Sequence, residues 1–105
     1  MPSTAPLPTK LPKVTNKEKT RLAPLWKVLF HNDDKTTMDF VVGVLMKFFG
    51  HDIDKAMQIM LEVHNTGIGL AGTYPKEIAE LKMEQCISAA RPKFPLKVTI
   101  EPVEE

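Results

Sequence analysis

Polar acceptors crowd a short segment, 31–40, that joins a strand-like run to a helix-like run. The aromatic and aliphatic side chains of the preceding run, 25–30, suit a pleated surface. After the segment, apolar residues recur every three or four positions, which is typical of a helix. Asn32, Asp33 and Asp34 favour an Asx turn followed by a helix cap. The alternative is that this cluster of acceptors binds a cation.

Length and charge limit the classes of protein to be considered. With 105 residues and 43% apolar content, the chain predicts one small domain with a modest core. Its 14 basic and 13 acidic residues give a net charge of +1, which argues against a nucleic acid or an anionic membrane as the main partner. The single cysteine, Cys86, has apolar neighbours, which predicts a buried thiol in a reducing compartment. Because no leader and no membrane-length apolar run is present, we expect a cytoplasmic protein.

Residues 1–24 differ in composition from the rest of the chain. Proline and basic residues dominate this segment, and it has few large apolar side chains. Such a mixture cannot bury enough surface to offset the entropy of ordering the backbone. We therefore predict a flexible, disordered tail over 1–24 and a folded domain over 25–105. The tail can serve as a solubilising leader, a tether or a handle for another machine.

The region after the first strand predicts two helices. Thr36 is the expected N-cap of the first helix, whose apolar stripe ends at Gly50. Asp52 is the expected N-cap of the second helix, which Gly67 closes.

The last third of the chain predicts a strand, a helix and a final strand. Residues 68–74 are interrupted by glycines that allow a bulge or a close backbone approach. Pro75 is expected to open a helix that Arg91-Pro92 stops, and the alternation over 95–100 predicts the final strand. The order strand, helix, helix, strand, helix, strand predicts an α+β fold, a two-layer domain with three helices on a three-stranded antiparallel sheet.

His64 falls on the apolar stripe of the second predicted helix, together with Met60. A histidine there is commonly a satisfied structural residue, but a nearby acceptor cluster would give its ring a ligand to help bind. A metal site built from His31, Asp33, Asp34 and His64 is a third interpretation. The chain has no HExxH motif, no paired cysteines and no calcium-loop spacing, so we expect no metal and no other cofactor.

The turn and the histidine belong to a longer set of motifs. These are Trp-Lys-Val-Leu-Phe-His-Asn-Asp-Asp over 26–34, Thr36, Met38, Phe-Val-Val over 40–42, Lys-Phe-Phe over 47–49, Ala-Met-Gln-Ile-Met-Leu-Glu-Val-His over 56–64, Gly67, Glu-Ile-Ala-Glu over 77–80, Lys82 and Pro95-Leu96. In this order and spacing they resemble the ClpS family over about 80 of the 105 residues. The Asn-Asp-Asp turn combined with the later Met-Leu-x-Val-His run is more specific than either piece alone.

The resemblance implies an adaptor that is not an enzyme. ClpS proteins bind N-degrons, which are substrates with a destabilising N-terminal residue, and deliver them to the AAA+ unfoldase ClpA or a ClpC-type relative that feeds the peptidase ClpP. Carried over from the family, the amine-binding residues are Asn32, Asp33 and His64. A free α-amino group has a pKa of about 7.7 to 8.0, so it is mostly an ammonium at neutral pH and needs such acceptors. An acetylated amine should bind poorly.

Beside the amine site, the family has an apolar pocket for the first side chain of the substrate, which Leu, Phe, Tyr or Trp should fit. The matching positions are Asp34 at the rim, with Thr36, Met38, Val41, Met60 and Leu96. In the family pattern, Met38 is a flexible wall that crowds out Ile and Val. Without the resemblance, each apolar residue can be plain core packing, especially Val41 and Met60.

Unfoldase docking in the family uses the third predicted helix, where Glu77 and Lys82 match the charged positions. Without the resemblance, both are ordinary solvated charges. The tail over 1–24 would be the segment that the unfoldase engages. We expect the chain to act as a monomer.

Some positions depart from the family pattern. Thr37 stands where the family often has proline, Pro75 replaces the usual Ser or Thr cap, and the connection 91–94 before Leu96 is shorter and less acidic than usual.

Two alternatives to an adaptor remain: a small metal-dependent or hydrolytic enzyme that uses the Asp and His residues, and a scaffold without a ligand. For the enzyme, the chain offers no Ser or Cys in a nucleophile elbow or redox motif.

Overall fold

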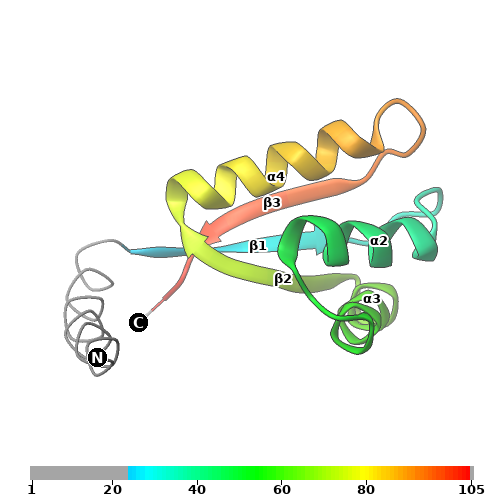
Figure 1. The fold of residues 1–105 in the computed structure, drawn as a ribbon, viewed down its shortest axis with the longest axis horizontal. Helices are drawn as coiled ribbons and strands as arrows, with labels where there is room; N and C mark the ends of the chain where they lie inside the picture. Colours follow the sequence, from blue (N-terminus) through cyan, green and yellow to red (C-terminus); the bar gives the residue numbers. More distant parts are fainter. Residues whose placement is uncertain (1–23, 105) are drawn as a thin grey trace, which may run out of the picture.

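Strands and helices follow one another along the chain in the predicted order (Figure 1). The computed structural model describes residues 24–104, so the predicted tail over 1–24 lies outside the described residues except for Pro24. The elements are β1 Leu25–His31, α2 Met38–Phe49, α3 Ile53–Thr66, β2 Ile68–Pro75, α4 Lys76–Ala90 and β3 Lys97–Pro102. Within residues 24–104, three helices and a three-stranded antiparallel sheet confirm the predicted α+β fold.

Strand β1 is the central strand of the sheet, with β2 on one side and β3 on the other, both antiparallel to it. Its Val28 and Phe30 are fully buried, whereas the alternate residues Lys27, Leu29 and His31 are only partly buried. This period of two means that one face of the sheet meets the helices and the other face is open. Helix α4 packs against all three strands, and α3 packs against β2 (Figure 1).

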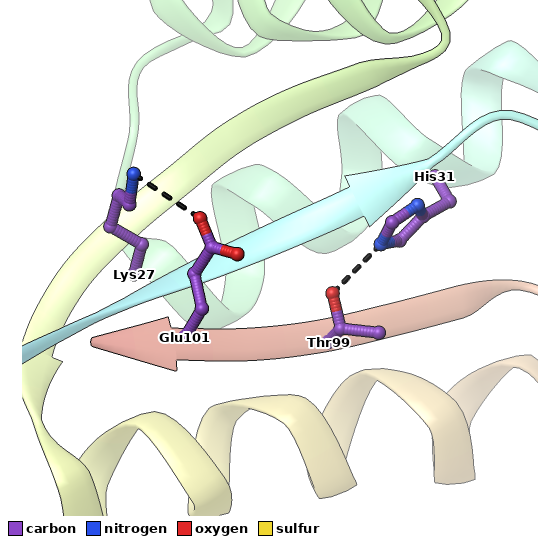
Figure 2. Close-up of polar contacts among 4 residues, drawn as sticks. All are labelled: Lys27, His31, Thr99 and Glu101. Carbon is purple, nitrogen blue, oxygen red and sulfur yellow. Dashed lines mark hydrogen bonds and ion pairs between the residues drawn. The ribbon is translucent and has the colours of Figure 1, made fainter. Parts of the chain in front are cut away.

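The open face of the sheet carries polar pairs between β1 and β3 (Figure 2). Lys27 Nζ and Glu101 Oε2 are 3.3 Å apart, and His31 Nε2 lies 2.7 Å from Thr99 Oγ1. Burial and the positive charge of Lys97 lower the pKa of His31, although the charge of Glu101 partly opposes them. Within residues 24–104, no group of three or more His, Cys, Asp or Glu side chains is arranged to hold a metal ion.

Strand β2 contains a bulge and, at Gly69, a close approach to a neighbouring helix. The pairing of β2 with β1 skips Ala71, which lies as a bulge between the paired Leu70 and Gly72. A Cβ atom on Gly69 would lie 2.5 Å from Val63 Cγ2, so α3 can pack this closely on β2 because residue 69 has no side chain. Both expectations for the glycine-interrupted strand are confirmed.

Glycine and aspartate fix three of the four ends of the first two helices as predicted. Gly50 (φ 71°) ends α2 and Gly67 (φ 95°) ends α3, both in the left-handed conformation. Asp52 is the N-cap of α3, because its Oδ1 accepts a hydrogen bond from the backbone N–H of Lys55 at 2.8 Å.

The N-terminus of α2 differs from the prediction. Thr37 is the N-cap and Thr36 is not: Thr37 Oγ1 accepts a hydrogen bond from the backbone N–H of Phe40 at 3.2 Å. The Thr36 hydroxyl instead donates to Asp33 Oδ2 at 2.6 Å, which holds this side chain against the turn. The carboxylate of Asp33 therefore holds the side chain of Thr36, and the next threonine along the chain caps the helix.

The third helix lies where the sequence predicts it, and the last strand is shifted. Pro75 directly precedes α4 and Arg91 directly follows it, which confirms the predicted start and stop. The predicted strand over 95–100 is observed at Lys97–Pro102, because pairing with β1 continues to the end of that range. Leu96 therefore lies just before β3.

The core lies between the helices and the covered face of the sheet. Its largest fully buried side chains are Phe30, Leu45, Leu96, Val28 and Cys86. Burial raises the pKa of the Cys86 thiol to about 12, although the charge of Lys82 opposes this, and the predicted buried thiol is confirmed. Among residues 24–104, no helix combines the length and the apolar character needed to cross a membrane.

Candidate functional site

The turn after β1 is organised by the carboxylate of Asp33. Its Oδ1 accepts hydrogen bonds from the backbone N–H groups of Lys35 (2.8 Å) and Thr36 (2.7 Å), and its Oδ2 accepts one from the Thr36 hydroxyl (2.6 Å). These contacts confirm the predicted Asx turn. The backbone N–H of Asn32 donates to the carbonyl oxygen of Gly67 at 3.0 Å, which ties the turn to the end of α3.

The same hydrogen bonds keep Asp33 ionised. Partial burial raises the pKa of this carboxyl group, but the hydrogen bonds from the Thr36 hydroxyl and from the backbone N–H groups of Thr36 and Lys35 outweigh it. The pKa of Asp33 therefore lies below its ordinary value, and the group is a carboxylate at neutral pH. The turn thus holds a fixed negative charge.

A pocket of about 450 Å³ lies between this turn, the first turn of α2 and the C-terminal part of α3. The turn contributes polar side chains, α2 contributes apolar ones, and α3 contributes two apolar side chains and one histidine. The lining residues are Asn32, Asp33, Asp34, Thr36, Thr37, Met38, Val41, Met60, Val63 and His64. One cavity therefore combines acceptors for a cation with an apolar surface.

Burial divides the apolar lining into two levels. Val41, Met60 and Val63 are buried and belong to the hydrophobic core, so they pack in the core and line the pocket at the same time. Met38, at the start of α2, is 44% exposed and lies at the rim. The pocket therefore has a fixed floor and one accessible, flexible wall residue.

Three polar side chains of the lining are not engaged by other residues within 24–104. Asn32, Asp34 and His64 are exposed, and none of their side chains makes a hydrogen bond or an ion pair in this part of the chain. Asp33 differs, because it already accepts three hydrogen bonds from the turn. Amide, carboxylate and imidazole acceptors around one cavity suit a ligand with several N–H donors, such as an ammonium.

All predicted amine-site and pocket residues except Leu96 line this one pocket. Leu96 does not line the pocket and is fully buried in the core just before β3, so its predicted place at the pocket wall is not supported. Sequence reasoning missed Thr37 and Val63. The spacing of Val63 three residues after Met60 was the available signal, because residues at i and i+3 share a helix face.

The two predicted docking residues lie on α4, outside the pocket lining. Glu77 is exposed. Lys82 Nζ donates to the carbonyl oxygen of Phe48 at 2.6 Å and lies 5.5 Å and 5.9 Å from the ring centroids of Tyr74 and Phe49. The interpretation of Lys82 as an ordinary solvated charge is therefore wrong, because its ammonium holds the C-terminal end of α2.

Comparison with known proteins identifies the family of the chain. A family model described as ATP-dependent Clp protease adaptor protein ClpS matches residues 21–99. The chain belongs to the ClpS family. The ATP-dependent Clp protease adapter protein ClpS of Desulfatibacillum aliphaticivorans is 51% identical over 86 residues, which are 81% of this chain and 83% of that protein. The ClpS of Campylobacter jejuni strain 81-176 is 44% identical over 94 residues, which are 87% of this chain and 98% of that protein.

A solved ClpS structure has the same fold. It is ClpS2 of Agrobacterium tumefaciens bound to L-phenylalaninamide, which superposes with a TM-score of 0.74 and is 32% identical in sequence. The match covers 77% of this chain and 99% of that chain. The ClpS family relationship is therefore supported by sequence and by fold.

Proposed function

We propose that this chain binds the free α-amine and the bulky hydrophobic first side chain (Leu, Phe, Tyr or Trp) of N-degron substrates, and delivers them to a ClpA- or ClpC-type unfoldase for degradation by ClpP. The pocket carries the proposal, because unengaged acceptors on Asn32, Asp34 and His64 lie beside an apolar floor. The L-phenylalaninamide named with the Agrobacterium tumefaciens protein supports it. That molecule has a free α-amine, an aromatic side chain and an amide where a peptide chain would continue.

The α-ammonium of the substrate would lie among the acceptors of the turn and of α3. We assign Asn32, Asp33 and His64 to this role, together with Asp34, whose carboxylate has more free lone pairs than that of Asp33. A carboxylate about 4 Å from an ammonium gains roughly 4 kcal/mol at a surface-like dielectric, before desolvation and association entropy are subtracted. Acetylation removes the charge and leaves a single N–H donor.

The first side chain of the substrate would occupy the apolar part of the pocket. Val41, Met60 and Val63 would form the floor and Met38 the wall, which crowds the β-branched side chains of Ile and Val. Burying a Leu or Phe side chain contributes roughly 1.5 to 3 kcal/mol. Because association entropy offsets much of either term, recognition should require the amine and the side chain together. Thr36 would act through Asp33, whose carboxylate it holds.

Titration of peptides that differ only in the first residue or in acetylation of the N-terminal amine tests this proposal. A Phe-initiated peptide should bind saturably, whereas its acetylated form and a Gly-initiated peptide should each bind at least about tenfold more weakly. Equal binding of the acetylated peptide would contradict amine recognition, and equal binding of the Gly-initiated peptide would contradict the side-chain pocket. Mass spectrometry of the recovered peptide tests the enzyme alternative, since an adaptor returns the peptide intact.

We further propose that α4 docks the unfoldase, with exposed Glu77 in direct contact and Lys82 holding α4 against α2. The segment 1–24 is proposed as the part that the unfoldase engages. Glu77→Lys should abolish co-elution with the unfoldase and leave the affinity for the Phe-initiated peptide unchanged. Unchanged co-elution would show that docking uses another surface.

A further inference from the structure

Met38 differs from the other methionines within residues 24–104 because it both lines the pocket and is exposed. Its exposed fraction is 44%. Met46 and Met57 are similarly exposed, at 40% and 44%, but they lie outside the pocket lining. Met60 lines the pocket but is only 7% exposed. The chain therefore contains exposed methionines away from the pocket and a covered methionine within it, and both serve as internal controls.

The thioether of an accessible methionine reacts with a hydroperoxide without help from other protein groups. With hydrogen peroxide, the sulfur lone pair attacks one peroxide oxygen, so that an S–O bond forms and the O–O bond breaks. The leaving hydroxide takes the proton of the attacked oxygen, which gives the sulfoxide and water. Sulfur loses two electrons and the peroxide gains them. Because access to sulfur controls this reaction, Met38 should react faster than Met60.

We propose that Met38 is an oxidation-sensitive modification site of the pocket, where conversion of its thioether to the sulfoxide by a hydroperoxide weakens the binding of hydrophobic first residues. The inference rests on the proposed function, because it concerns the wall of the same pocket. It adds a chemical modification that changes the occupancy of the site.

The physical reason is the polarity of the sulfoxide. Oxidation converts a flexible apolar side chain into a polar one with a strong acceptor oxygen. A Leu or Phe side chain that enters the pocket has no donor for this oxygen, so binding would strip water from it without replacement. The nearby carboxylates of Asp33 and Asp34 accept hydrogen bonds only, so they offer no donor to the sulfoxide oxygen.

The experiment compares peptide affinity before and after treatment of the full chain with hydrogen peroxide. Peptide mapping by mass spectrometry measures the sulfoxide at each methionine, and near-UV circular dichroism checks that the fold is retained. We expect affinity for a Phe-initiated peptide to fall about tenfold once Met38 is oxidised, and to recover after treatment with a methionine sulfoxide reductase.

Leucine variants identify the responsible methionine. In Met38→Leu, the ratio of affinities before and after peroxide should be close to one, whatever the starting affinity of the variant. In Met46→Leu combined with Met57→Leu, the starting affinity should be unchanged and the tenfold loss should remain. Met60→Leu should also retain the loss, because the covered Met60 is not the reacting group.

Two results would overturn the inference: unchanged affinity when Met38 is fully converted to the sulfoxide, or an equal loss in Met38→Leu. Either result would leave the proposed function intact, because the untreated chain would still bind the peptide. Failure of the untreated chain to bind the Phe-initiated peptide would instead contradict the proposed function.

Discussion

The two ends of helix α2 are held by different chemistry. At the N-terminal end, the turn 32–37 has more polar groups than the fold uses, since Asp33 is bonded within the turn while Asp34 remains open to the pocket. At the C-terminal end, the ammonium of Lys82 donates to the carbonyl oxygen of Phe48 and lies over two aromatic rings. Polar groups left open at the first end suit a ligand, whereas the charge at the second end serves the fold.

This difference predicts how substitutions at the two ends behave. A polar group that is satisfied within the chain contributes to stability, so its loss should appear mainly in the free energy of unfolding. A polar group that is open to a pocket contributes little to stability, so its loss should appear in ligand affinity.

The largest effect is expected for Asp33→Ala, which removes three hydrogen bonds to a carboxylate. The free energy of unfolding, measured by urea denaturation, should fall by about 2 to 3 kcal/mol, and peptide affinity should fall with it. Asp34→Ala is the matched control: its unfolding free energy should change by less than about 0.5 kcal/mol, while its affinity for a Phe-initiated peptide falls about tenfold. Normal stability of Asp33→Ala and normal binding by Asp34→Ala would together refute this division of roles.

The carboxylate of Asp33 should also make the stability of the turn depend on pH. Folding lowers its pKa from the ordinary value of 3.8, so at acid pH the unfolded chain takes up the proton more readily than the folded chain. The contribution of Asp33 to stability is therefore present above pH 3.8 and is lost as the pH falls through the folded pKa. The difference in unfolding free energy between the original chain and Asp33→Asn should narrow as the pH is lowered from about 6 to about 3. A constant difference over this range would contradict the assignment.

At the other end of α2, Lys82→Met keeps the aliphatic stem and removes the ammonium. The free energy of unfolding should fall by about 1 to 2 kcal/mol, because the carbonyl of Phe48 loses its donor and the rings lose their cation. Peptide affinity should change by less than about twofold, since Lys82 does not line the pocket. Lys82→Arg, which retains a donor and a charge, should recover part of the stability. A large loss of peptide affinity with an unchanged free energy of unfolding would show that Lys82 serves ligand binding and not the stability of the fold.

Most of the fold could be predicted because its signals are local. Gly50 and Gly67 end their helices through their own backbone conformation, and no distant contact is needed to foresee that. The N-cap of α2 was harder, because Thr36 and Thr37 carry the same hydroxyl group. The structure shows Thr36 bonded to the Asp33 carboxylate and Thr37 capping the helix, and the sequence does not contain the direction in which that carboxylate points.

The candidate site was only partly predictable, because several of its contacts join residues that are far apart in the sequence. The turn acceptors are adjacent in the sequence, so a local pattern indicates them. No spacing rule indicates that His64 lies near them, and that expectation came from the resemblance to the ClpS family. Lys82 bonds to a residue 34 positions earlier, and no local pattern carries such a contact. Leu96 follows a short connection, and its placement in the core depends on how α4 and β3 pack together.

The smallest effect is expected for Thr37→Ala, which removes the hydrogen bond to the backbone N–H of Phe40. Loss of this N-cap should lower the free energy of unfolding by about 0.5 to 1 kcal/mol, and Thr37→Ser, which keeps the hydroxyl, should restore most of it. Peptide affinity should fall by no more than about twofold, because the cap acts on the helix backbone while the open acceptors are on other residues. If Thr37→Ala matched Asp33→Ala in either measurement, the cap and not the carboxylate would hold this end of α2. The contrast between the two ends would then depend on a neutral hydroxyl at one end and an ammonium at the other.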